Sequence, residues 1–316
     1  MPETGPGKLC PAANKQFLKL NSLIMKQIKN LLVIFLSAVI FISCKKAEIN
    51  TQRMNLNITG LEDLGPNFRY EGWLMVSGTP VSAGIFSVNT TGTLSQTAFD
   101  INKDQLAAAT DYILTIEPFP DTDPAPTSTH ILAGSFATNT ATISTNDAKA
   151  LGTNFSAATG KYILATPTDG AANNEKSGLW FIDISGGAPM AGLNLPTLPV
   201  GWVYEGWAVI GGKAITSGRF TSTTAADQSA PFSGTVAAGP AFPGEDYLMN
   251  APVGFTFPTD LSGGLAVISV EPQPDNSPAP FLLKPLLANI PAAALDHVTY
   301  NMGLNTVSLP SGTVSR

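Results

Sequence analysis

Cysteine and histidine are scarce in this chain of 316 residues, which contains two of each. Cys10 and Cys44 both precede the main body of the chain, so that body can hold neither an internal disulfide framework nor a thiolate metal site. With only His130 and His297 available, most zinc sites and most histidine-based catalytic arrangements are out of reach. We therefore expect no metal and no cofactor.

Charged residues are also scarce, at 13% of the chain against 44% hydrophobic residues. The chain has 29 glycines and 25 prolines, which predicts frequent turns between short apolar runs. This composition is typical of a β-rich exported protein. The net charge of −6 argues against binding to nucleic acid and against electrostatic binding to an anionic membrane.

Sequence motifs of common enzymes are missing. The chain has no G-x-S-x-G, H-E-x-x-H, G-x-x-x-x-G-K-[ST] or G-x-G-x-x-G, so we expect a protein that is not an enzyme. Glu117, Asp121 and Asp123 could present oxygens to calcium. Asp and Asn are also ordinary turn residues, and a turn is the interpretation we adopt here.

The segment from Met25, "MKQIKNLLVIFLSAVIFISCKK", has two early lysines, a short apolar run and a small residue before Cys44. It resembles a bacterial lipoprotein signal, with an ordinary signal peptide or a membrane anchor as alternatives. We expect residues 1–43 to be a signal peptide region with the true start at Met25. Lipid would then be attached to Cys44, and residues 44–55 would be the anchor and tether. The protein would lie in the bacterial cell envelope, facing the periplasm or the cell surface.

The tetrapeptide "YEGW" occurs twice, at 70–73 and 204–207, and a glycine and a phenylalanine follow it at matching positions. A second matching block follows each copy, "YILTIEPFPDTDPAP" (112–126) and "AVISVEPQPDNSPAP" (266–280). Two ordered blocks indicate a tandem duplication. A Gly/Pro/Ala stretch at 185–192 suggests the boundary, giving domains at 56–188 and 189–316.

The second copy carries 20 more residues between its blocks than the first, because the offsets of the two blocks are 134 and 154. These extra residues include "AFPGEDYLMNAPVGFTFP" (241–258). A long connection on a β scaffold can carry function. It can equally be an added hairpin that covers the core.

Both blocks have the patterns of strands. The first predicts a hairpin in which Tyr70 and Leu74 share one face while Glu71 and Trp73 share the other. In the second block, Leu114 and Ile116 point one way while Thr115 and Glu117 point the other, which predicts a half-buried strand that ends at Glu-Pro. Further strands are expected at 161–166, 180–184 and 299–304, and short helices at 103–109 and 145–151. The predicted fold is mainly β, with two tandem antiparallel β-sandwich-like domains and short helices.

The order strand, "EP", Pro-rich acidic turn, strand resembles the extracytoplasmic C-terminal domain of the anti-sigma-K factor family. The matching stretches are 114–134 and 268–286, each preceded by a "YEGW" strand. Members of that family also have a cytoplasmic helical domain that holds a sigma factor, and nothing here resembles it. The resemblance therefore implies the extracytoplasmic module alone, in two copies, and the sigma-binding role is not carried over.

Four repeated aromatic residues are the candidate binding residues: Tyr70, Trp73, Tyr204 and Trp207. Aromatic faces can stack on sugars or anchor a partner protein. They can equally pack in the core, where Gly72 and Gly206 would leave room for a neighbouring ring.

These observations predict a membrane-anchored, non-catalytic binding or sensing module in the cell envelope. Its partner would be an unidentified envelope or membrane protein, and the lipid would hold it at the membrane. The alternative is a structural or adhesive surface lipoprotein that binds glycan through the repeated aromatic residues.

Overall fold

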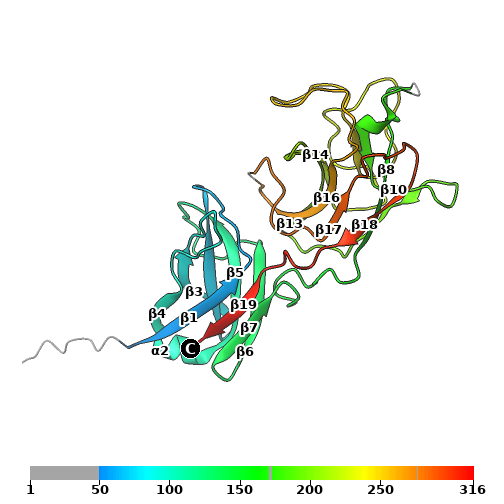
Figure 1. Ribbon diagram of the computed structural model, residues 1–316. Coiled ribbons are helices and arrows are strands. Elements are labelled where there is room, and N and C mark those ends of the chain that lie inside the picture. The colour runs from blue at the N-terminus through cyan, green and yellow to red at the C-terminus, as the bar shows by residue number, and fades with distance from the viewer. Residues whose placement is uncertain (1–49, 171–172, 276) are drawn as a thin grey trace, which may run out of the picture. The chain divides into compact units, whose positions relative to one another are not determined.

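The computed structural model describes residues 50–170, 173–275 and 277–316 (Figure 1). The predicted signal peptide region and the predicted lipid attachment site at Cys44 lie outside the described residues. Asn50–Arg316 forms one compact unit. The expected tether is shorter than predicted, because residues from Thr51 onward already belong to the first strand, β1 (Thr51–Thr59).

The prediction of a mainly β fold with antiparallel sheets is confirmed. Within the described residues, the strands form two large antiparallel sheets of eight and nine strands. We call the parts built around them the first and second lobes. In order across the sheet, the first lobe contains β3 (Thr79–Phe86), β2 (Phe68–Val76), β5 (Ala109–Pro118), β6 (His130–Ala137), β7 (Thr140–Ser144), β19 (Ser311–Ser315), β1 and β4 (Ala98–Asn102). The second contains β14 (Lys213–Phe220), β13 (Trp202–Ile210), β16 (Leu265–Pro272), β17 (Leu286–Asn289), β18 (Tyr300–Leu304), β8 (Thr159–Leu164), β9 (Gly178–Trp180) and β15 (Gly244–Asp246), with β12 (Leu193–Asn194) beside β8.

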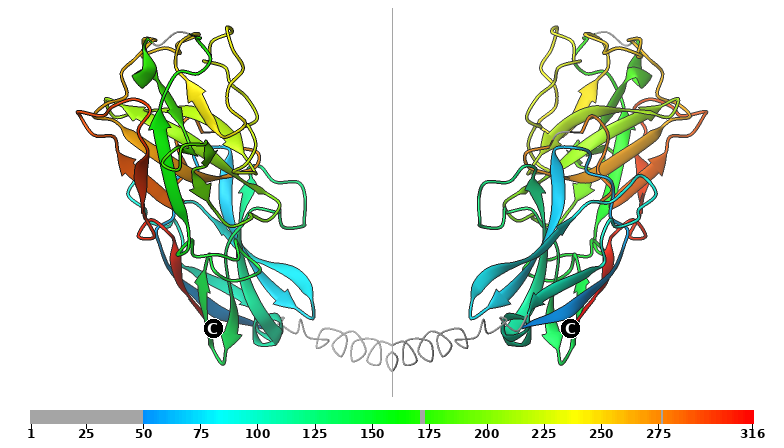
Figure 2. Two further views of the ribbon diagram at one scale, coloured as in Figure 1. Left: turned by 90° about the vertical axis from the view of Figure 1, so that its right-hand side faces the viewer. Right: turned by 90° about the vertical axis from the view of Figure 1, so that its left-hand side faces the viewer.

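The two repeats exchange their last strands. In the first lobe β19, the last strand of the second repeat, lies between β7 and β1 (Figure 1; Figure 2). In the second lobe β8, the last strand of the first repeat, lies between β18 and β9. The orders β7-β19-β1 and β18-β8-β9 are equivalent. Each repeat therefore completes the sheet of the other.

The strands do not divide at residue 188, where the sequence suggested the boundary. β8 and β9 precede residue 188 but belong to the second sheet, and β19 follows it but belongs to the first. The Gly/Pro/Ala stretch instead joins β10 (Ile182–Asp183) to β11 (Met190–Ala191), which pair with each other. The Gly/Pro/Ala-rich composition at 185–192 therefore marks a hairpin turn within the second repeat and not a domain boundary.

The predicted hairpin is present in both copies. β2 pairs with β3 through a turn at Ser77-Gly78, where both residues have positive φ (52° and 79°), and β13 pairs with β14 through a turn at Gly211-Gly212. Positive φ at both turn positions suits the right-handed twist of the strands. The repeated Gly84 and Gly218 have φ of 119° and 112° and follow a β-bulge in each hairpin.

Helices are short. α2 (Lys103–Ala108) confirms the helix expected at 103–109, and the Asn102 side chain caps it by accepting from two backbone N–H groups. The helix expected at 145–151 is wrong. That segment is a series of turns in which Asp147 O accepts from the N–H groups of Ala150 and Gly152. A 3₁₀ turn, η1 (Glu175–Ser177), lies in the second lobe.

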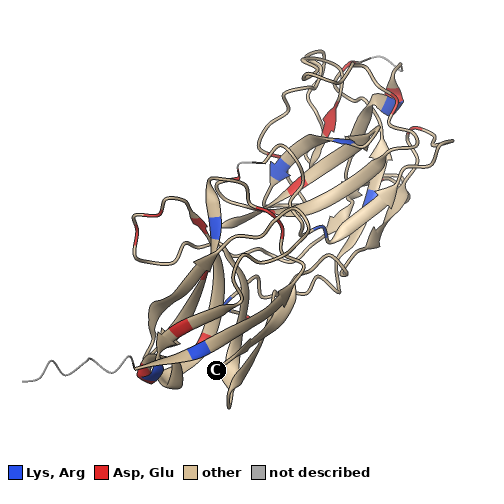
Figure 3. Cartoon of the chain, turned by 60° about the vertical axis from the view of Figure 1, so that its left-hand side comes forward, with Lys and Arg blue, Asp and Glu red and all other residues tan. Residues whose placement is uncertain are grey.

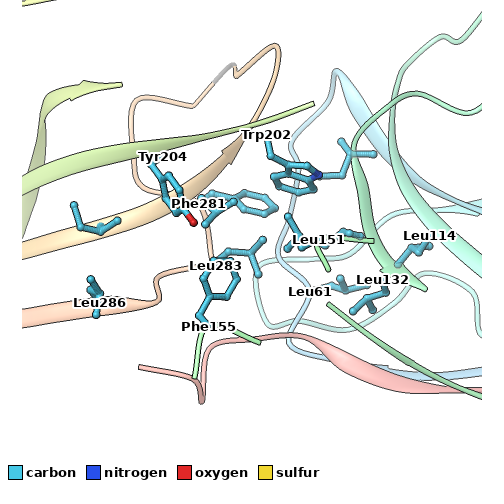
Figure 4. Packing of buried hydrophobic residues seen from close by; sticks show 14 of the residues in the cluster. Leu61, Leu114, Leu132, Leu151, Phe155, Trp202, Tyr204, Phe281, Leu283 and Leu286 are labelled. Carbon is cyan, nitrogen blue, oxygen red and sulfur yellow. The ribbon is translucent and has the colours of Figure 1, made fainter. Parts of the chain in front are cut away.

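The core is a hydrophobic cluster that includes buried side chains of both lobes, among them Leu61, Leu132, Trp202 and Phe281 (Figure 4). The repeated glycine of "YEGW" has the packing role predicted for it. A Cβ at Gly72 would collide with the ring of Tyr112. None of the helices in the described part of the chain combines the length and apolar character that a membrane crossing requires.

The inserted residues 241–258 cover the core of the second lobe, although not as a hairpin. They supply β15, which pairs with β9, and the fully buried Tyr247. The Tyr247 ring lies 6.1 Å from Phe232 and 5.5 Å from Phe257. Of the two roles left open for this segment, the structure shows the structural one.

Candidate functional site

The four candidate aromatic residues are buried. Tyr70 is fully inaccessible to solvent, and Trp73, Tyr204 and Trp207 are each 3% exposed. The two tyrosine hydroxyls donate to backbone carbonyls, at 3.1 Å for Tyr70 and 2.6 Å for Tyr204. These rings present no face to a ligand, so the core role is the one the structure supports.

Trp73 instead starts a buried polar chain in the first lobe. Its indole Nε1 donates to Thr115 Oγ1 at 2.9 Å, and Thr115 in turn donates to Glu117 Oε1. The backbone N–H of Thr127 also donates to this oxygen at 2.9 Å. The carboxyl group of Glu117 is thus held directly by Thr115 and Thr127, and through Thr115 it is linked to Trp73.

The second lobe repeats this chain. Trp207 Nε1 donates to Ser269 Oγ at 2.8 Å, and Ser269 donates to Glu271 Oε1. The backbone N–H of Phe281 takes the place of the Thr127 N–H, at 2.9 Å. The motif Ser/Thr-x-Glu-Pro therefore encodes a buried hydroxyl–carboxyl pair rather than a half-exposed strand end.

Both glutamates are protonated more readily than usual. Burial raises the pKa of Glu271 to about 8 and raises the pKa of Glu117 as well. In each residue Oε2 is buried and has no hydrogen-bond partner among the described residues. A neutral carboxyl group costs less to keep in such a place than a carboxylate.

The glutamate of "YEGW" lies on the same sheet face as this chain. Glu71 is 5% exposed and Glu205 is 3% exposed, so both are buried. Ser82 Oγ donates to Glu71 Oε1, and Thr216 Oγ1 donates to Glu205 Oε1 at 2.5 Å. Each lobe thus buries two glutamates on neighbouring strands.

The second lobe neutralises its glutamates with Arg219, which lies directly across the β13–β14 pair from Glu205. Arg219 Nε donates to Glu205 Oε2 at 3.0 Å, and its Nη2 donates to Asp275 Oδ2. Burial alone would lower the pKa of Arg219, but the negative charges of Glu205, Asp275 and Glu271 raise it overall. The guanidinium is therefore held in a three-carboxyl site.

Other sequence candidates do not gather into a site. His130 Nδ1 is 2.7 Å from Lys149 O, and His297 Nδ1 is 3.0 Å from the neighbouring Asp296. Asp121 and Asp123 accept backbone N–H groups two residues on, which is turn geometry. In residues 50–170, 173–275 and 277–316, no cluster of His, Cys, Asp or Glu is arranged to hold a metal ion.

The acidic network could not be seen in the sequence, because the alternation predicted half-buried strands with Glu117 and Glu271 on the face away from the core. Charged residues are sparse on both sheets (Figure 3), and several of the acidic side chains are buried. Two repeated glutamates, Glu71 and Glu205, in a chain of few charges were the available signal. The partner Arg219 had no counterpart in the first copy and gave no signal.

Comparison with protein-family models, curated proteins and solved structures finds no match for the chain. The resemblance to the anti-sigma-K factor family therefore stays a prediction from the residues quoted above.

Proposed function

We propose that this protein is a membrane-anchored extracytoplasmic lipoprotein that acts as a non-catalytic binding or sensing module in the cell envelope. Its two repeats would derive from the extracytoplasmic C-terminal module of the anti-sigma-K factor family. The observation that carries the proposal is the position of the lipoprotein-like signal. Six residues (45–50) separate Cys44 from β1, a reach of at most about 25 Å. Lipid on Cys44 would hold the β unit against the membrane surface.

The buried networks support a structural and not a catalytic role for these carboxyl groups. Their polar groups hold strands together, and the carboxyl groups of Glu117 and Glu271 are tied to neighbouring hydroxyls inside the lobes. The glycan alternative relied on Trp73 and Trp207, whose indole rings are buried. We therefore propose a protein of the envelope as the partner.

Replacement of Cys44 by serine is expected to release the protein from the membrane fraction and to abolish capture of its partner. The lipid supplies the attachment, since the chain is acidic and gains little from anionic headgroups. The measurement is in-cell crosslinking of tagged wild type and Cys44→Ser, followed by membrane fractionation and mass spectrometry. A Cys44→Ser protein that stays on the membrane would contradict the anchor, and a wild type that captures no specific protein would contradict the binding role.

A further inference from the structure

The two lobes differ at one position of an otherwise repeated site. On β14, Arg219 lies opposite Glu205, and at the equivalent place on β3, Ile85 lies opposite Glu71. The first lobe therefore has the acidic residues of the site without the arginine that fills it in the second lobe.

The oxygens that hold Arg219 have counterparts in the first lobe. In the second lobe, Glu205 uses Oε1 for Thr216 and Oε2 for Arg219. In the first lobe, Glu71 uses Oε1 for Ser82, and its Oε2 has no hydrogen-bond partner among the described residues. Glu71 Oε2 is not among the fully buried atoms that lack a partner, so it keeps a small accessible area although Glu71 as a whole is only 5% exposed.

Asp121 of the first lobe occupies the position that Asp275 has in the second lobe. Oδ1 of each accepts the backbone N–H two residues on, at 2.9 Å in Asp121 and 2.8 Å in Asp275. Oδ2 of Asp275 accepts from Arg219, whereas Oδ2 of Asp121 has no hydrogen-bond partner within the described part of the chain. The charges of Glu71 and Asp121 interact, and one oxygen on each of these two carboxyl groups is thus available in the first lobe.

The acidic group of the first lobe also contains a buried carboxyl oxygen, Oε2 of Glu117, without a hydrogen-bond partner in the part of the chain that the structure describes. Glu117 is 2% exposed, its Oε2 has no partner in the described segments, and its charge interacts with that of Glu71. Its counterpart Glu271 interacts with Arg219 through charge, and Oε2 of Glu271 likewise has no hydrogen-bond partner among the described residues, so this oxygen is common to both lobes. Arg69 lies across the strand pair from Glu117, but its Nη1 donates to the backbone oxygens of residues 65, 66 and 68. The guanidinium of Arg69 is therefore bonded to the backbone and not to the carboxyl group of Glu117.

The surface around the acidic group has exposed apolar area. Ile85 is 46% exposed, and Phe119, which follows Glu117 by two residues, is 49% exposed. The guanidinium of Arg69 lies over the Phe119 ring at 4.3 Å, so this ring already accepts one planar cation. Apolar surface beside paired carboxyl oxygens suits an arginine, which has an apolar stem and a planar head with several donors.

We propose that the first lobe binds the guanidinium group of an arginine side chain from a partner protein, between Glu71 and Asp121, where the second lobe holds its own Arg219. This inference rests on the proposed binding function and specifies the chemistry of the partner. The second lobe is the filled form of the site, and the first lobe is the open form. Arginine is favoured over lysine because two separate carboxyl oxygens require a forked donor.

The test is a titration of the full chain, solubilised in detergent and methyl-labelled at isoleucine, with the peptide Ac-Gly-Arg-Gly-NH₂. We expect saturable shifts of the Ile85 methyl signals. The same peptide with citrulline, which has the shape of arginine without its charge, is expected to give none, and the lysine peptide is expected to bind about tenfold more weakly. Equal binding of the lysine or citrulline peptide would overturn the proposal.

Two substitutions at the open position give matched variants. Ile85→Arg supplies the lobe with its own guanidinium and is expected to lower peptide affinity at least about tenfold, followed on the other isoleucine methyls and by calorimetry. Ile85→Leu keeps the apolar surface and is expected to bind like the wild type. Equal unfolding midpoints of the two variants and the wild type would show that the fold is intact. Undiminished binding by Ile85→Arg would overturn the site.

In-cell crosslinking separates this inference from the proposed function. If Ile85→Arg does not capture the partner that the wild type captures, the arginine site and the proposed binding function are both supported. If both proteins capture the same partner equally, the arginine site is overturned and the binding function remains. If the wild type captures no partner, the proposed function fails, and the peptide titration still decides whether the site binds guanidinium.

Discussion

Deletion of residues 306–316 is expected to unfold the first lobe under conditions in which the intact protein is fully folded. These residues include β19, which pairs along one side with β7 and along the other with β1. Its removal leaves two interior strands of the sheet with unpaired backbone groups, each of which is costly when buried. It also removes Val314, which is fully buried. The expected loss is on the order of the whole stability of a small domain, 5 kcal/mol or more.

Arg316 adds to this effect because it ties the strand to the lobe. Its Nη1 donates to the carbonyls of Leu106 and Ala109 at 2.6 and 2.8 Å, and its Nη2 donates to Thr138 O at 2.9 Å. The guanidinium also lies over the Phe136 ring at 4.4 Å. The last turn of α2 and the β6–β7 hairpin would therefore loosen together with the sheet.

Hydrogen exchange measured by mass spectrometry checks this prediction. Amides of β1 and β7 are expected to lose protection in the deletion variant, whereas those of β13 and β16 keep it. Val314→Ala in the full chain is the control and is expected to cost about 2 kcal/mol without exposing the strands. Full protection of β1 in the deletion variant would show that β19 contributes little to the sheet.

The stability of the protein is expected to fall as the pH rises from 5 to 9. The folded-state pKa of Glu271 is about 8 and that of Glu245 about 7, both because of burial, against 4.5 for an ordinary glutamate. Below 4.5 the folded and unfolded states are both protonated, so the full stability is present. As the pH rises, the unfolded chain releases these protons first, and stability is lost until the pH passes the folded pKa.

Glu271 is expected to be the largest contributor. One pKa unit corresponds to about 1.4 kcal/mol, so this residue alone accounts for on the order of 4 kcal/mol between pH 5 and pH 8. Glu62 and Asp227, whose pKa values burial raises to about 7 and about 6, act in the same direction over the lower part of this window. The expected curve therefore falls throughout and levels off above pH 8.

Denaturant unfolding of the wild type and Glu271→Gln at pH 5, 7 and 9 is the measurement. The glutamine keeps the oxygen that accepts from Ser269 and the N–H of Phe281, and it cannot ionise. The variant is expected to be less stable than the wild type at pH 5 and to lose less stability by pH 9. A wild type as stable at pH 9 as at pH 5 would contradict the account of these buried carboxyl groups.

Much of each repeat could be predicted from its sequence. The alternation around "YEGW" and the Glu-Pro blocks predicted β2, β5, β13 and β16, because period-two patterns and turn residues are local signals. The helix predicted at 145–151 failed because Ala and Leu at helical spacing also suit a turn held by Asp147. Local pattern does not distinguish these two structures.

The exchange of strands could not be predicted. β19 is short and only Val314 is strongly apolar, so the segment carries no period-two signal of a central strand. The weak correspondence of "ATG" at 158–160 with "PSG" at 310–312 marks the equivalent strands but not their partners. Pairing between distant segments is decided by the whole sheet, which a local pattern does not contain.

The acidic site was missed for a similar reason. The alternation in β5 placed Glu117 opposite Leu114 and Ile116, on a face expected to be wet. In the structure this second face is covered by a small cluster of Trp73, Ile113, Ala133 and Ala150. Both faces of the strand are therefore buried, and the carboxyl group of Glu117 is hydrogen-bonded to Thr115 and Thr127 inside the lobe.

Disulfide trapping tests the exchanged strands most directly. Cys10 and Cys44 are first replaced by serine, which leaves a chain without thiols. Asn57 and Thr313 are directly opposite each other in β1 and β19, at a separation that a disulfide can bridge. The pair Asn57→Cys and Thr313→Cys is expected to form an intramolecular disulfide in the folded protein, and the pair Asn301→Cys and Thr313→Cys is expected to form none. The reverse result, in which β19 is trapped beside β18 in the second lobe, would contradict the exchange.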